Sequence, residues 1–304
     1  MPRTKDARRL LPATERPNPR TARIDRLPTE QLLRVINQQD RYVAAVVAAT
    51  LPKIAEAVDA IVAALRRGGR LIYVGAGTSG RLGVVDAAEI PPTFQVSRER
   101  VQAVIAGGRR AMFRAVEGVE DAIAAGRRDL AAKRVGQRDV IVALTASGTT
   151  PYVLGALRFA RQQRATTVAV TVNPDSPAAR LARIAICPRT GPEVIAGSTR
   201  MKAGTAQKLV LNMLSTAAMI RLGHVYRNLM VNVQMSSRKL RARGRRVLMR
   251  ALGCDGRTAT RLMRRSGGNL KAAIVMGKLG CSLAEAKRRL DAAAGVVHRA
   301  IGES

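Results

Sequence analysis

Short apolar runs alternate with amphipathic stretches through the middle of the 304-residue chain. Strands that alternate with helices imply a parallel, doubly wound sheet, because each crossover lays its helix on one face. The sequence therefore predicts an α/β fold with three layers, in which helices cover both faces of one sheet. The expected strands lie at residues 71–74, 101–106, 139–144, 167–172 and 184–187.

Helical patterns flank this sheet on both sides. Apolar stripes predict one helix from Pro28 onward and a longer one over residues 40–67, and residues 209–220 are apolar enough to be a buried helix. Residues 256–301 predict three short helices. The expected organisation is a flexible basic arm at residues 1–20, the sheet domain with its N-terminal helices at 21–245 and a small helical lobe at 246–304.

The first strand ends in a turn rich in glycine and hydroxyl groups, residues 75–80, and a helix follows. Gly77 lets the backbone approach a ligand, Thr78 and Ser79 can donate to oxygens, and free N–H groups at a helix start attract an anion. The turn lacks the Lys-Ser/Thr ending of a nucleotide P-loop, and no ribose-binding acid ends the second strand. We therefore expect a small monophosphate, with a purely connecting turn as the alternative.

Two later segments offer similar chemistry. Residues 145–151 follow the third strand with the hydroxyls of Ser147, Thr149 and Thr150, and Pro151 favours a helix start. Two such turns could hold one phosphate from two sides. Residues 191–208 form a third polar cluster, in which cations could pair with a phosphate or face solvent.

Acidic residues supply candidates for proton transfer. Pro91 and Pro92 are expected to end the first helix, so Glu89 should lie at its C-terminal end, where the helix dipole favours the protonated form of a general acid. Residues 111–125 predict a helix on which Glu117, Glu120 and Asp121 share one face. In a cleft, one of these acids could act as a general base; on the surface, they would form a solvated acidic face.

Composition and charge limit the partners. The 53 basic and 21 acidic side chains give a net charge of +32, which favours non-specific binding to nucleic acid or anionic membranes. However, an aromatic content of 2% leaves few stacking platforms for single strands. The scattered cysteines and isolated histidines predict no metal site, and no cofactor is expected. Without a signal segment or a long apolar span, the protein is expected in the cytoplasm.

Longer motifs resemble one known family. The segments GGRLIYVGAGTSGRLGVVDAAEIPPTF, AVEGVED, ASGTTPYV and GPEVIAGSTRMKAGTAQK follow one another in this chain. In this order they are similar to segments of N-acetylmuramic acid 6-phosphate etherases, which have a sugar-isomerase-type (SIS) domain. The resemblance implies cleavage of the lactyl ether of that sugar phosphate, by elimination and water addition, to give N-acetylglucosamine 6-phosphate and D-lactate.

The same resemblance implies roles for individual residues. Glu89 resembles the family's proton donor to the leaving group, and Glu120 its second catalytic glutamate and base, with Glu117 held in reserve. It also implies a homodimer in which a neighbouring subunit completes each site. The expected phosphate and sugar contacts are Gly77, Thr78, Ser79, Ser147, Gly148, Thr150, Ser198, Thr199 and Lys202.

The chain departs from the family pattern at two positions near the expected anion. Thr149 stands where the family usually has arginine, which removes a bidentate donor, and Arg109 stands where it has glutamate. Arg109 is therefore expected to compensate. Two other functions stay open: a non-catalytic sensor of sugar phosphates, and a nucleic-acid-binding regulator, although no helix-turn-helix domain precedes the SIS-like region.

Overall fold

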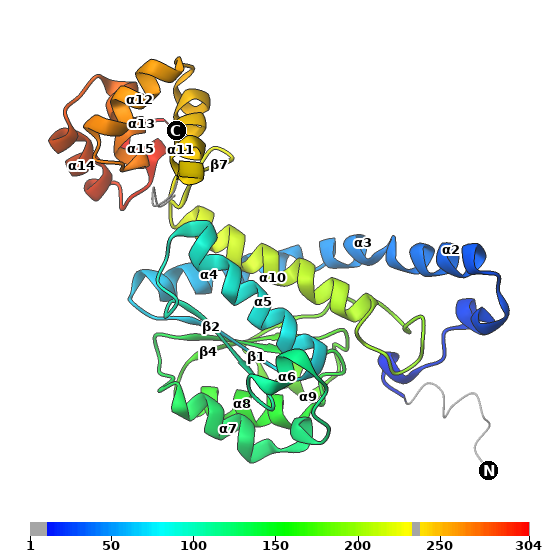
Figure 1. The fold of residues 1–304 in the computed structure, drawn as a ribbon. Helices are drawn as coiled ribbons and strands as arrows, with labels where there is room; N and C mark the ends of the chain where they lie inside the picture. The colour runs from blue at the N-terminus through cyan, green and yellow to red at the C-terminus, as the bar shows by residue number, and fades with distance from the viewer. Residues whose placement is uncertain (1–10, 233–237, 304) are drawn as a thin grey trace, which may run out of the picture. The chain divides into compact units, whose positions relative to one another are not determined.

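The computed structural model describes residues 11–232 and 238–303, and their contacts divide the chain into two units. The sheet unit comprises Met1–Ala88 and Arg98–Ser215, and the helical unit comprises Glu89–Ser97 and Thr216–Ser304. Helices α5 (Gly77–Phe94) and α10 (Lys202–Arg221) are continuous across the two boundaries. We describe each unit by itself (Figure 1).

Five parallel strands form the centre of the sheet unit. Their order is β2-β1-β3-β4-β5, and every residue of β1 and β3 is buried, since both strands have neighbours on either side and helices above and below. Near-continuous apolar runs are typical of such strands. The predicted parallel, doubly wound sheet is confirmed. The strands are β1 Leu71–Gly75, β2 Val101–Ile105, β3 Val140–Leu144, β4 Thr166–Val170 and β5 Ile184–Ile186.

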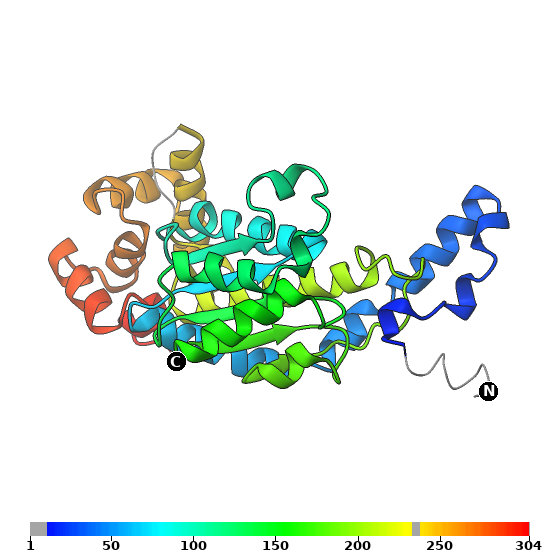
Figure 2. The ribbon, with the colours of Figure 1, turned by 90° about the horizontal axis from the view of Figure 1, so that it is seen from below.

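Helices cover both faces of this sheet. Figure 1 shows α4, α5 and α10 on one face and α7 and α8 on the other, and Figure 2 looks onto the α7 and α8 face. The long helix predicted over residues 40–67 is instead two helices. Its break falls at Ala49 and Thr50, because the Thr50 hydroxyl bonds the Val47 carbonyl at 2.7 Å and Pro52 occupies the first turn of the next helix. The bounds are α2 Thr29–Asp40, α3 Val43–Ala48, α4 Leu51–Arg66, α7 Ile123–Ala132, α8 Pro151–Gln162 and α9 Pro177–Leu181.

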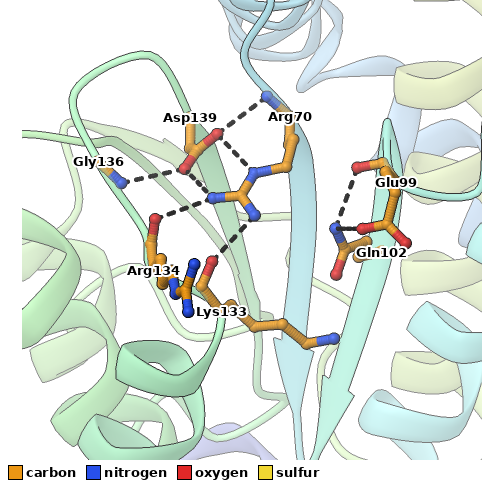
Figure 3. Close-up of polar contacts among 7 residues, drawn as sticks. All are labelled: Arg70, Glu99, Gln102, Lys133, Arg134, Gly136 and Asp139. Atoms are coloured by element: carbon orange, nitrogen blue, oxygen red, sulfur yellow. Dashed lines mark hydrogen bonds and ion pairs between the residues drawn. The ribbon is translucent and has the colours of Figure 1, made fainter.

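A partly buried ion pair joins the starts of β1 and β3, as Figure 3 shows. Arg70 precedes β1 and donates from Nη2 to Oδ2 of Asp139 at 2.7 Å and from Nε to Oδ1 at 3.0 Å. Its remaining donors reach the carbonyls of Lys133 and Arg134 at 2.9 and 3.1 Å. The Gly136 N–H completes the carboxylate's partners at 3.0 Å. The pair therefore fixes the alignment of the two central strands at the edge opposite their carboxyl ends.

The segment before α2 is partly described. Residues 1–10 of the expected flexible arm lie outside the described residues. Residues 11–20 contain the 3₁₀ turn η1 (Ala13–Glu15) and the start of η2 (Pro19–Thr21), and the side chains of Thr14 and Asn18 are buried.

Hydrogen bonds tie this segment to the loop before α10. The Gly197 N–H donates to the Thr14 carbonyl at 2.9 Å, and the Thr21 hydroxyl donates to the Val194 carbonyl at 2.8 Å. We call residues 14–21 and 192–197 the paired segments. Because their bonds join positions more than 170 residues apart in sequence, the segment 14–21 is held by the folded sheet unit.

The helical unit has its own small core. Ala272, Ala273, Ile274 and Val275 of the central helix α13 have no exposed surface. Three helices begin at side-chain caps, Asp255, Asn269 and Ser282. Residues 256–301 form four helices rather than the predicted three, because the chain makes one further turn, α15, after α14. None of the helices in the described ranges is long and apolar enough to cross a membrane. The elements are β6 Val225–Tyr226, β7 Leu229–Met230, α11 Arg238–Leu252, α12 Gly256–Arg265, α13 Leu270–Leu279, α14 Leu283–Ala292 and α15 Val297–Ala300.

Candidate functional site

A cavity of about 310 Å³ lies at the carboxyl ends of β1 and β3, within the sheet unit. We call it the substrate cavity. Its walls come from the β1–α5 turn, the β3–α8 turn, the stretch between β2 and α7, and the paired segments with the adjoining Thr199. Open α/β sheets bind ligands outside the carboxyl ends of their strands, and this volume suits a small ligand.

The β1–α5 turn is tight because its glycines touch one another. A Cβ atom on Gly80 would lie 2.7 Å from Cγ1 of Ile105 and 2.8 Å from the Gly75 carbonyl oxygen. Only glycine fits there, and it lets α5 begin directly behind the strand. Thr78 and Ser79 consequently occupy the first turn of α5 and line the substrate cavity together with Gly77. Free N–H groups at this helix start can bind an anion.

Ser79 is oriented by a second helix. Its hydroxyl donates to Oε1 of Gln207 on α10 at 2.8 Å, and both residues are buried. Gln207 in turn donates to the Val170 carbonyl of β4 at 3.5 Å. The side chain of Ser79 is thus fixed before any ligand arrives.

The β3–α8 turn closes on its own hydroxyl groups. Oγ1 of Thr145 lies 2.8 Å from Oγ1 of Thr150 and accepts from the Gly148 N–H at 3.1 Å. Oγ of Ser147 lies 2.9 Å from Oγ1 of Thr149. Ser147 and Thr150 line the substrate cavity, as does Thr145. The turn therefore presents several hydroxyls to one side.

Gly148 has a different part in this turn. It adopts a left-handed conformation with φ of 75°, and a Cβ atom would lie 2.1 Å from Oγ of Ser176. It does not line the cavity. Gly148 thus shapes the turn, while Ser147 and Thr150 line the cavity.

Two glutamates line the substrate cavity from an irregular stretch. The helix predicted over residues 111–125 is wrong: α6 (Arg110–Phe113) ends at once, and Gly118 with φ of 76° redirects the chain into the 3₁₀ turn η4 (Val119–Asp121). α6 ends because Arg114 adopts an extended conformation, with φ of −147° and ψ of 157°. Glu117 is exposed and Glu120 half-buried, and both line the cavity, whereas Asp121 does not.

Glu89 lies elsewhere on α5. The prediction that Pro91 and Pro92 end this helix is wrong, since it continues to Phe94, where Gln95 donates to the Pro91 carbonyl at 2.9 Å and takes φ of 55°. Proline lacks an N–H, but its φ is compatible with the helix, so two adjacent prolines near the end are accommodated. Glu89 is therefore inside the helix, exposed, and outside the set of residues that line the substrate cavity.

Two charged residues line the substrate cavity that sequence reasoning missed. Among the described lining residues Arg81 is the only cation, and its Nε and Nη2 atoms donate to the carbonyls of Met112 and Arg114 at 3.3 and 3.2 Å. Arg109, which we expected to supply a cation, does not line the cavity. The position of Arg81 directly after the glycine-rich turn was the available signal.

The second missed residue is Glu15, which comes from η1. Oε1 of Glu15 accepts from the Thr14 hydroxyl at 3.1 Å, and the paired segments hold it at the cavity. Nothing in the Arg- and Pro-rich N-terminal sequence indicated this position.

The residues of the third polar cluster, 191–208, do not all lie at the substrate cavity. Thr199 lines the substrate cavity, but Ser198 does not. Glu193 is buried and caps α10, since its carboxylate accepts from the N–H groups of Lys202 and Ala203 at 3.0 and 2.9 Å. Lys202 is buried beside a separate cavity, which it helps to line.

Comparisons with known proteins identify two matching family models and several similar proteins. Residues 53–161 match the family model of the glucokinase regulatory protein N-terminal SIS domain, and residues 110–217 match that of the SIS domain. N-acetylmuramic acid 6-phosphate etherase 2 of Vibrio cholerae serotype O1 is 52% identical over 286 residues, covering 94% of this chain and 93% of that protein. The N-acetylmuramic acid 6-phosphate etherase of Salmonella dublin is 51% identical over 288 residues, covering 95% and 97%. A phosphoheptose isomerase structure from Francisella tularensis covers 62% of this chain and 100% of its own, with 18% identity and a TM-score of 0.47.

Proposed function

Because this chain belongs to the N-acetylmuramic acid 6-phosphate etherase family, we propose that it cleaves the D-lactyl ether of that sugar phosphate. The products are N-acetylglucosamine 6-phosphate and D-lactate. The observation that carries the proposal is identity above 50% along almost the entire length of both chains. The substrate cavity, with two hydroxyl-rich turns at helix starts, supports it. As a catabolic enzyme of a small phosphorylated sugar, the protein would act in the cytoplasm.

The proposed phosphate and sugar contacts are the predicted residues that line the substrate cavity. The phosphate would sit against the starts of α5 and α8, where N–H groups and hydroxyls converge. Arg81 would supply the one positive charge from the lining. Thr149 keeps its hydroxyl engaged with Ser147, so it does not replace an arginine. The predicted residues that line the cavity, and that we propose as contacts, are Gly77, Thr78, Ser79, Ser147, Thr150 and Thr199.

The proposed chemistry is an elimination followed by addition of water. In the open-chain aldehyde the C2 proton is acidified by the C1 carbonyl, and a carboxylate base removes it. The electron pair forms the C2–C3 double bond, the C3–O bond breaks, and the lactate oxygen receives a proton from an acid. Water then adds its hydroxyl at C3 and a proton at C2. A positioned base and acid each contribute about 100-fold to 10,000-fold.

We assign the base to Glu120. It is half-buried and lines the substrate cavity, whereas Glu117 is exposed at its edge and remains in reserve. The family resemblance gives the acid to Glu89. Since Glu89 does not line the substrate cavity of its own chain, the acid would come from a second subunit, so we propose a homodimer with shared sites.

Incubation of the purified protein with N-acetylmuramic acid 6-phosphate, with D-lactate measured enzymatically, tests the reaction. Glu120→Gln should lower kcat at least about 100-fold and abolish deuterium incorporation at C2 in heavy water. Asp121→Asn is the matched control, because this adjacent acid does not line the cavity. Binding of the sugar phosphate without release of D-lactate would overturn the enzyme in favour of a sensor.

A further inference from the structure

A second cavity of about 950 Å³ lies in the sheet unit, between the α2–α3 junction, residues 18–20 and the start of α10. We call it the Lys202 cavity. It shares no lining residue with the substrate cavity. Among its described lining residues are the cations Arg20, Arg41 and Lys202, and none is acidic.

Lys202 is buried without a negative partner. The residue has no exposed surface, and its Nζ atom donates to the Tyr42 hydroxyl at 2.8 Å and to Oε1 of Gln39 at 3.4 Å. Its ammonium also lies 5.1 Å from the centre of the Tyr42 ring. All of these partners are neutral. Among the described residues, Lys202 forms no ion pair. Asp40 is the acid next to Gln39 in sequence, but it neither pairs with Lys202 nor lines the cavity.

The neutral partners are also engaged elsewhere. The Tyr42 hydroxyl donates to the Thr190 carbonyl, and Oε1 of Gln39 accepts from Nδ2 of Asn18 at 2.8 Å. An ammonium group has three donors, and only two have partners here. Burying a charge costs free energy unless an opposite charge accompanies it. The Lys202 cavity therefore holds a buried positive charge that none of its described lining residues balances.

Two arginines line the same cavity. Arg20 and Arg41 are exposed, and neither forms an ion pair among the described residues. Guanidinium groups bind phosphate oxygens in pairs, and a lysine adds a compact positive charge. We propose that the Lys202 cavity binds a phosphate group, with Arg20 and Arg41 as its contacts at the opening and Lys202 as the buried positive charge behind them. The phosphate can belong to inorganic phosphate or to a phosphate monoester.

Isothermal titration with inorganic phosphate in chloride buffer tests this site. The double variant Arg20→Ala/Arg41→Ala should weaken phosphate binding to the Lys202 cavity at least about tenfold, and phosphate should raise its melting temperature by less than it raises that of the parent protein. The rise that remains comes from the substrate cavity, whose lining residues this double variant leaves unchanged. The double variant Arg158→Ala/Arg161→Ala removes the same charge from exposed positions of α8 that line neither cavity, and it should bind phosphate like the parent. Equal weakening in both double variants would overturn the site, as would unchanged affinity in the first.

Titrations with other anions identify the ligand, and a variant of Lys202 tests the buried charge. Glucose 6-phosphate that competes for the site identifies a monoester, exclusive binding of inorganic phosphate identifies the free ion, and preferential binding of acetate would overturn the phosphate assignment. Lys202→Met keeps the side-chain volume without the charge, and it should weaken phosphate binding to the Lys202 cavity while the far-ultraviolet circular dichroism stays unchanged. If Lys202→Met does not fold, the two arginine double variants decide the proposal on their own.

Discussion

Replacing Asp139 by asparagine tests the ion pair that aligns β1 with β3. The carboxylate accepts four hydrogen bonds, three from Arg70 and one from Gly136, and its side chain is 6% exposed. Asparagine loses the charge and turns an NH₂ group toward these donors. Breaking a buried ion pair costs about 3–5 kcal/mol. Because the Arg70 side chain is 24% exposed and keeps its bonds to two carbonyls, we expect about 3 kcal/mol.

The stability difference between the parent protein and Asp139→Asn should also depend on pH, in a direction that the pKa of Asp139 determines. Burial alone raises the pKa of Asp139, but the hydrogen bonds from Arg70 and Gly136 outweigh it and hold the pKa below its ordinary value of 3.8. A carboxyl whose pKa is lower in the folded state adds stability above the unfolded value, and this is lost as the pH falls through the folded pKa. The difference between the parent protein and Asp139→Asn should therefore be full near neutrality and shrink below about pH 4.

Urea unfolding followed by circular dichroism measures the effect. The midpoint should fall at unchanged slope, and the melting temperature should drop by about 6–12 °C. Asp25→Asn is the control, since Asp25 pairs with Arg26 where both side chains are more than three-quarters exposed, and it should change stability by less than about 0.5 kcal/mol. A loss below about 1 kcal/mol for Asp139→Asn at neutral pH, or a difference independent of pH, would refute the reasoning.

Three further predictions concern the β3–α8 turn, the buried Asp86 of α5 and the cation Arg81. Gly148→Ala should cost about 2–4 kcal/mol in thermal unfolding, because its Cβ would clash with Ser176 at positive φ; loss of less than about 1 kcal/mol would show that the turn can relax. Asp86→Asn should change the pH dependence of stability in the opposite sense to Asp139→Asn, because burial raises the pKa of Asp86 despite the hydrogen bond from Tyr73. The parent protein should therefore gain stability relative to the variant as the pH falls toward about 4, and a difference independent of pH would contradict this. Arg81→Ala should raise KM for the sugar phosphate at least about tenfold with a smaller change in kcat, and an unchanged KM would remove Arg81 from substrate binding.

The sheet was predictable from sequence because its strands are buried on both faces. Runs such as Val140–Leu144 contain no polar residue, so they can be only core strand or core helix, and their length and flanking turns decide for strand. The two hydroxyl-rich turns were found for the same reason. Each comes directly after such a run, so its position at the carboxyl edge follows from the direction of the parallel strands.

The remaining parts of the candidate site depend on contacts that sequence patterns do not contain. The break between α6 and η4 begins at the extended Arg114 and includes Gly118 at positive φ, whereas the sequence predicted one continuous helix. Conversely, two prolines suggested a helix end where α5 continues to Phe94. Glu15 reaches the substrate cavity only because hydrogen bonds from a segment about 180 residues later hold η1 in place. Local propensity cannot report such distant bonds.

The paired segments give the two cavities a common wall. Glu15 and Gly197 face the substrate cavity from this wall, while Asn18 and Pro192 face the Lys202 cavity, and Asn18 donates to the Pro192 carbonyl at 3.4 Å. A displacement of either paired segment would consequently change the lining of both cavities. A ligand in one cavity should then change the affinity of the other cavity for its ligand, and the factor should be the same in both directions.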